Sequence, residues 1–148
     1  MDYLTDLAND EEIDSYDQSL QDFFAQKMDV DRFTATRLQM GIYGQRQDGV
    51  NMVRIKVPGG RLISSQLEAI ADVTEKYVQS GEAHVTTRQD IQLHYVPLAD
   101  TPAVIRHLAK GGLTTREACG NTIRNVTACP LTGVCSREHT DISQHLGG

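Results

Sequence analysis

Residues 50–57 have the sequence VNMVRIKV, and Pro-Gly-Gly follows them directly. Apolar and charged side chains alternate in this stretch, with Val53 and Ile55 on one side and Arg54 and Lys56 on the other. A period of two is typical of a strand that buries only one of its faces. Proline and glycine are typical of the turn that ends such a strand. The stretch therefore predicts a half-buried strand.

The neighbouring segments predict the rest of one domain. Ser65 and Glu68 have the spacing of a helix-capping box, and apolar residues recur at helical spacing from there to Gly81. The further predicted elements are a strand at 83–87, a strand at 91–96, a helix from Asp100 to Gly111 and a strand at 122–127. This βαββαβ order predicts an α+β, ferredoxin-like half-domain. Such a fold does not by itself specify a function.

Charge is unevenly distributed along the 148 residues, whose net charge is -6. Residues 1–31 contain ten acidic residues and one base, Lys27, whereas the remainder contains 13 Lys or Arg against ten acids. The acidic total argues against a nucleic-acid partner. Apolar runs are far shorter than the roughly 20 residues of a membrane span. The acidic start does not resemble a signal peptide, so we expect a cytoplasmic protein with reduced cysteines.

The N-terminal 40 residues are expected to form a separate, acidic extension. Residues 1–12 are expected to be disordered, and Ile13 to Met28 has the apolar spacing of a helix. The extension could dock a partner or could be a solvated lead-in to the domain.

One face of the predicted sheet is unusually basic. Alternation places the apolar residues Val53, Ile55, Val57, Ala83, Val85, Ile91, Leu93 and Tyr95 on the other face. The polar face carries Arg54, Lys56, His84, Thr86, Arg88, Gln92 and His94, without a carboxylate. Gathered cations destabilise a sheet unless an anion neutralises them, and arginine is well suited to bind oxyanions. The alternative is an ordinary exposed sheet face.

The three cysteines do not have the spacing of a metal site. Cys129 and Cys135 enclose five residues, whereas zinc ligands are usually separated by two to four. An all-thiolate iron–sulfur cluster needs four cysteines. We therefore assign no metal ligand and expect Cys119, Cys129 and Cys135 to be buried or idle thiols.

Three segments together resemble the first half of the siroheme-dependent nitrite and sulfite reductases. They are GIYGQR at 41–46 with MVRIKVPGG at 52–60, then TTRQDIQLH at 86–94, then NTIRNV at 121–126 running to Cys129-Pro130. The resemblance implies a ferredoxin-like half-domain at 41–111 and the start of a siroheme and 4Fe-4S domain at 112–148. The complete enzyme would reduce nitrite to ammonia or sulfite to sulfide with six electrons.

The resemblance also implies roles for particular residues. Arg54 and Arg124 would bind the substrate anion. A second set would hold the macrocycle and its carboxylates: His84, Thr86, Thr87, Arg88, Gln92, His94 and Asn125. The electron donor would be a protein such as ferredoxin.

This sequence departs from the family pattern in its cysteines. The family's Cys-x5-Cys and Cys-x3-Cys pairs bind the cluster, and only the spacing of Cys129 and Cys135 imitates one of them. We therefore expect an N-terminal fragment that is inactive alone, retains neither cofactor, and acts with the remaining half of the reductase. The alternatives are a non-catalytic module that binds an anionic tetrapyrrole or a partner, and a face that a second half covers. The sequence does not distinguish nitrite from sulfite.

Overall fold

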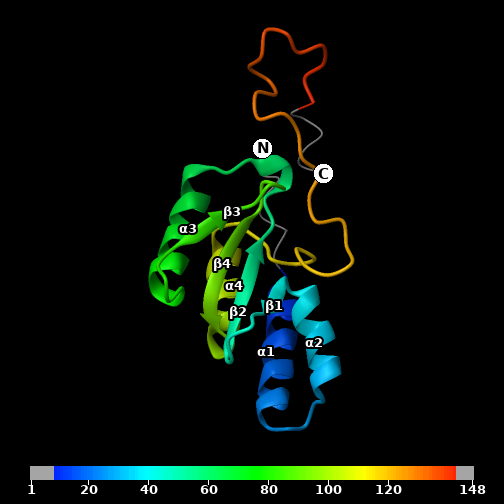
Figure 1. Cartoon of the computed structure of the whole chain (residues 1–148), viewed down its shortest axis with the longest axis vertical. Helices are drawn as coiled ribbons and strands as arrows, with labels where there is room; N and C mark the ends of the chain where they lie inside the picture. The colour runs from blue at the N-terminus through cyan, green and yellow to red at the C-terminus, as the bar shows by residue number, and fades with distance from the viewer. Residues whose placement is uncertain (1–8, 143–148) are drawn as a thin grey trace.

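The computed structural model describes residues 9–142 (Figure 1). Two helices come first, followed by a sheet domain with two more helices. In chain order the elements are α1 (Asp10–Phe24), α2 (Val30–Gln39), β1 (Ile42–Gly44), β2 (Val50–Ile55), α3 (Ser64–Tyr77), β3 (Ala83–Val85), β4 (Ile91–Pro97) and α4 (Thr101–Lys110). Short 3-10 turns, Pro58–Gly60 and Leu98–Asp100, follow β2 and β4.

The strands form one antiparallel sheet in the order β1-β2-β4-β3. The prediction of an α+β, ferredoxin-like half-domain is confirmed, with two N-terminal helices before it. The prediction of a strand at 122–127 is wrong, because that segment has no strand hydrogen bonds. The fourth strand is β1 instead, and its residue Ile42 pairs with Val53 at the edge of the sheet.

Helices α3 and α4 cover one face of the sheet, and the core lies between these helices and the sheet (Figure 1). The fully buried side chains there include Ile42, Val53, Ile55, Val73, Leu93, Val96, Val104 and Leu108. The polar face is therefore the one that these two helices leave uncovered. No helix in the described residues is long and apolar enough to cross a membrane.

Helix α3 has a different cap from the predicted one. Ser65 and Glu68 do not form a capping box, because the N-cap residue is Ile63, two residues before Ser65. The Gln66 side-chain oxygen accepts a hydrogen bond from the Ile63 amide at 3.1 Å, and its amide group reaches the Gly112 carbonyl at 3.4 Å. A glutamine therefore satisfies the helix start and ties it to the end of α4.

The N-terminal extension is a helical hairpin and not a single helix from Ile13 to Met28. Helix α1 ends at Phe24, and the next turn includes Gln26 in the left-handed region at φ 57°. Asn9 and Asp29 cap the two helices through their side chains. The reversal lets both helices bury apolar residues against the sheet domain. The sequence before Val30 has no pattern that predicts this second helix.

Acidic side chains of α1 attach this hairpin to the sheet domain. Arg106 of α4 donates to Asp14 at 2.7 Å and to Asp17 at 2.9 Å, and Arg116 donates to Glu12 at 2.9 Å. Exposed ion pairs of this kind contribute little individually. They nevertheless show that part of the acidic segment contacts this chain's own arginines.

A buried tyrosine connects the same two parts. The Tyr16 hydroxyl lies 2.7 Å from the Thr101 hydroxyl, which itself donates to the Leu98 carbonyl at 2.8 Å. Tyr16 must therefore donate, and burial raises its pKa to about 12. Tyr16→Phe should lower the free energy of unfolding by about 1 kcal/mol, measured by urea denaturation. Tyr43→Phe, at an exposed position, is the control and should change it by less than about 0.5 kcal/mol.

Candidate functional site

Arg54 lies at the centre of the uncovered sheet face. It stands opposite Gln92 in the β2–β4 register. In the amide orientation that satisfies both groups, the Gln92 oxygen accepts from Arg54 Nε at 3.1 Å and also from Nη2. Arg54 Nη1 donates to the Ala118 carbonyl at 3.1 Å. These bonds fix the guanidinium group over the sheet.

The two arginines predicted to bind the substrate anion contact the same short backbone segment. Arg54 donates to the Ala118 carbonyl, and Arg124 Nη2 donates to the Gly120 carbonyl at 3.4 Å. Cys119 lies between Ala118 and Gly120 in the sequence, and burial raises the pKa of its thiol although the charges of both arginines lower it. Arg54 and Arg124, 70 positions apart in sequence, thus contact the two residues that flank Cys119.

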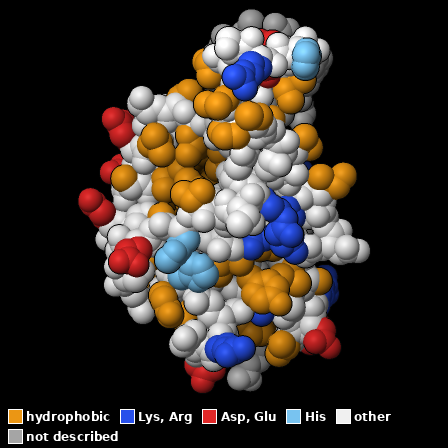
Figure 2. All heavy atoms as spheres, turned by 45° about the horizontal axis from the view of Figure 1, so that its top comes forward, with side chains coloured by type: hydrophobic (Ala, Val, Ile, Leu, Met, Phe, Trp, Pro, Cys, Tyr) orange, Lys and Arg blue, Asp and Glu red, His pale blue; other side chains and the backbone are white. Residues whose placement is uncertain are grey.

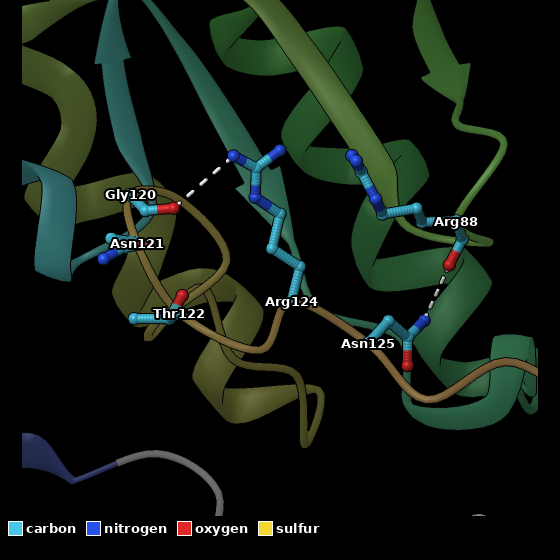
Figure 3. Close-up of a pocket in the computed structure, with 6 residues that line it drawn as sticks. All are labelled: Arg88, Gly120, Asn121, Thr122, Arg124 and Asn125. Atoms are coloured by element: carbon cyan, nitrogen blue, oxygen red, sulfur yellow. Dashed lines mark hydrogen bonds between the residues drawn. The ribbon is translucent and has the colours of Figure 1, made fainter.

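A polar cavity of about 290 Å³ lies beside Arg124 (Figure 3). Its lining residues are Arg88, Gly120, Asn121, Thr122, Arg124 and Asn125. Figure 3 shows the Arg88 and Arg124 side chains projecting in the same direction from the β3–β4 turn and from the C-terminal segment. None of the lining residues is acidic, so the cavity suits a carboxylate or a small oxyanion.

Asn125 holds the C-terminal segment against the sheet. Its Nδ2 lies 2.8 Å from the Val57 carbonyl, 2.9 Å from the Arg88 carbonyl and 3.2 Å from Asp90 Oδ1. Its Oδ1 accepts from the Gly59 amide at 3.3 Å. Both ends of the amide are thus engaged within the protein. The contacts orient the two arginines beside it, since Arg124 precedes Asn125 and Arg88 is bonded to it.

Asp90 places a carboxyl group beneath the basic face. The alternation pattern predicted no carboxylate on that face. It is only 1% exposed, and its Oδ1 accepts from the Val57 amide at 3.1 Å. Burial raises its pKa, while that amide and the nearby charges of Arg54, Lys56 and Arg88 lower it. Because the carboxyl is buried, it does not compete with a ligand at the surface.

Two histidines lie side by side on the same face. The rings of His84 and His94 are 5.0 Å apart between centroids and nearly perpendicular, at 88°. Gln45 follows β1, and its Nε2 lies 3.5 Å from Nδ1 of His94. Figure 2 shows a histidine patch and a Lys or Arg patch near the middle of one face, with hydrophobic side chains around them and acidic groups mainly at the edges of the view.

The predicted alternation fails at both ends of the sheet. Tyr95, expected in the apolar set, is 36% exposed and has φ 59°, and Val96 is buried in its place. A register shift between β2 and β4 produces this break. Ala83 and Val85 are exposed because β3 is an edge strand. The pattern holds on the inner strands over residues 53–55 and 91–94, which is where Arg54 and Gln92 lie.

The two predicted threonines do not line the cavity. Thr86 Oγ1 accepts from the Asp90 amide at 3.1 Å and so stabilises the β3–β4 turn. Thr87 is exposed in that turn. Sequence reasoning missed Gly120, Asn121 and Thr122, because the segment was read as the approach to a strand. Gly120, at φ 84°, was the available signal of a turn there.

The cysteines are free thiols. Cys119 is buried, Cys129 is exposed and Cys135 is intermediate. Residues 9–142 contain no group of three or more His, Cys, Asp or Glu side chains placed to hold a metal ion. The described part of the chain thus offers no ligand set for an iron–sulfur cluster.

Comparisons with known proteins agree with this fold. Residues 43–111 match the family described as the nitrite/sulfite reductase ferredoxin-like half domain. The ferredoxin–nitrite reductase of Leptolyngbya laminosa is 34% identical over 103 residues, which are 69% of this chain and 20% of that protein. The chloroplastic ferredoxin–nitrite reductase of Arabidopsis thaliana is 32% identical over 126 residues, 84% of this chain and 22% of that protein.

The chain therefore spans about a fifth of the length of these curated relatives. Among solved structures, the NirA protein of Mycobacterium tuberculosis superposes with a TM-score of 0.76 and 23% identity. The match covers 97% of this chain and 29% of that one. At this identity the likeness shows the fold alone.

Proposed function

Because residues 43–111 form a nitrite/sulfite reductase ferredoxin-like half domain, we propose that the chain supplies the arginine-bearing face of a siroheme- and 4Fe-4S-dependent nitrite or sulfite reductase. The observation that carries the proposal is the convergence of Arg54 and Arg124 on the backbone around Cys119, beside the cavity shared with Arg88. Three guanidinium groups from separate segments meet on one face without an acidic side chain lining the cavity. Such an arrangement favours an anionic ligand.

The residues present fit a macrocycle with carboxylate substituents. Arg88 and Arg124 project together into open, polar space, and His84 and His94 add ring nitrogens on the same sheet face. Gln92 orients Arg54 and is not assigned to a ligand, because its side-chain oxygen accepts from the Arg54 guanidinium group. We assign Arg88 and the histidines to the macrocycle carboxylates and Arg54 and Arg124 to the substrate anion. Residues 112–142 would then open the siroheme domain.

The cluster is not assigned to the described residues, because their thiols do not meet in one place. It would be held by the remaining half of the reductase, which is the proposed partner. When bound, siroheme and the cluster supply the electron transfer that carries nitrite to ammonia or sulfite to sulfide, with ferredoxin as the proposed donor. This chain's arginines orient the substrate oxyanion and stabilise its charge.

Siroheme titration tests the assignment of Arg88 and Arg124. Addition of the chain should shift the siroheme absorption spectrum, with weak affinity because the chain contributes one side of the site. Replacing both arginines by glutamine should weaken the affinity about tenfold or more, since charge-assisted hydrogen bonds to carboxylates are lost. Lys110→Gln, at the exposed end of α4, is the matched control and should bind as the wild type does. Equal affinity of the double variant and the control would count against the assignment.

A non-catalytic module that binds an anionic tetrapyrrole or a partner is the alternative function, because such a module would use the same basic face. The two functions differ in turnover. The test is a hybrid reductase in which residues 41–128 of this chain replace the aligned region of the Leptolyngbya laminosa ferredoxin–nitrite reductase. A module would support siroheme retention without reduction of either anion.

A further inference from the structure

The hydrogen bonds of Gln45 determine where the neutral His94 ring carries its proton. Gln45 Oε1 accepts from the Tyr95 amide at 2.7 Å, so its Nε2 is the group that faces His94. An amide nitrogen can only donate. His94 Nδ1, 3.5 Å away, must therefore accept, and the ring proton lies on Nε2. A second proton on Nδ1 would face the Gln45 amide group and lose this contact.

Neighbouring charges also oppose a positive His94. Burial lowers its pKa, and His84 from β3 and Arg54 from β2 lower it further. The Tyr95 ring also lies beside His94, with the two ring centroids 6.4 Å apart. Glu82 is the carboxylate closest to the pair in sequence, two residues before His84, and it is exposed. Burial and these neighbouring groups thus favour the neutral form of His94 in the free chain.

An anionic group placed over the face would reverse this balance. The rings are 5.0 Å apart between centroids, so one anion can lie close to both. A carboxylate near an imidazole favours the charged ring. His84 is exposed and His94 is only partly buried, so a ligand can approach the pair.

We propose that the His84–His94 pair takes up a proton from solvent when a carboxylate of a tetrapyrrole binds this face. This inference rests on the proposed function, which supplies the ligand class. The proton adds to a ring nitrogen of the pair, and the imidazolium then donates to the carboxylate.

The direction of the pH dependence follows from linkage. The complex binds more protons than the free chain, so affinity rises as pH falls. The window extends from the lowered pKa of His94 in the free chain upward to its raised pKa in the complex. Carboxylates of the ligand titrate near pH 4 and do not contribute there. We expect the dissociation constant to increase about tenfold from pH 6 to pH 8.

Two measurements test the proton coupling. In the free chain, NMR titration of the imidazole C–H signals should show that His84→Gln raises the pKa of His94. With siroheme, the tenfold change between pH 6 and pH 8 should shrink to less than about twofold in His84→Gln and His94→Gln. The control is His107→Gln, whose ring lies 3.7 Å from Asp72 on α3 and should leave the pH dependence unchanged.

The outcomes separate this inference from the proposed function. Siroheme binding that is independent of pH in the wild type overturns the proton coupling and leaves the reductase assignment in place. A His94 pKa that does not respond to His84→Gln overturns it as well. Absence of siroheme binding at both pH values overturns both proposals. Because His84 is exposed, its replacement leaves the core intact.

Discussion

Replacing Asn125 by alanine should destabilise the chain by about 1–3 kcal/mol and free the segment that carries Arg124. The buried Asp90 carboxyl would lose one of its donors, and the Val57 and Arg88 carbonyls would lose theirs. Urea denaturation measures the stability, and hydrogen exchange of the amides at 120–128 should become faster. Siroheme affinity should fall in parallel, since Arg88 and Arg124 lose their common support.

Two further variants separate this contact from a general loss of polarity. Asn121→Ala removes an exposed amide from the same cavity and should change stability by less than about 0.5 kcal/mol. Asn125→Asp places a second carboxyl beside Asp90 and should be more harmful than alanine at neutral pH. Lowering the pH protonates one member of this pair, so part of the stability should return. Equal stability of Asn125→Ala and Asn121→Ala would show that the hydrogen bonds of Asn125 do not stabilise the chain.

In the hybrid reductase, Arg54→Ala should lower turnover of nitrite or sulfite by about 100-fold or more. Removal of one fixed donor to a developing oxyanion typically costs this much. Arg54→Lys keeps the charge but loses the planar pair of donors held by Gln92 and Ala118, so it should be intermediate. Steady-state oxidation of a reduced dye measures the rate, with siroheme content determined by absorbance.

The control for Arg54 is Arg46→Ala, which removes an exposed cation near β1. It should retain turnover within about twofold of the unsubstituted hybrid. If Arg54→Ala retained both siroheme and full turnover, Arg54 would have no role in binding the substrate anion.

Much of the sheet domain could be predicted from sequence because its inner strands alternate over most of their length. Residues 50–57 and 91–94 each show the period of a strand with one buried face, and α4 has a clear start at Pro102 and end at Gly111. Strand β1 has only three residues, too few for a periodic signal. The segment 122–127 contains only two apolar residues, Ile123 and Val126, which are three positions apart and do not alternate. Side-chain hydrogen bonds of Asn125, and not strand hydrogen bonds, attach this segment to the sheet domain.

The site was predictable only in part, for a physical reason. Alternation gave the face of Arg54, Gln92 and His94, since each lies on an inner strand. It gave no information on Asp90 and Gln45, whose side chains act from turns through contacts that depend on the folded arrangement. The assignment of Arg54 and Arg124 to one site came from the resemblance to a family.

Turnover by the hybrid reductase tests the central claim most directly. If this face belongs to a nitrite or sulfite reductase, the hybrid should retain siroheme and reduce nitrite or sulfite with a chemically reduced donor. The activity should be lost in the Arg54→Ala hybrid. A hybrid that holds siroheme at the level of the unmodified enzyme and reduces neither anion would contradict the claim and favour a binding module.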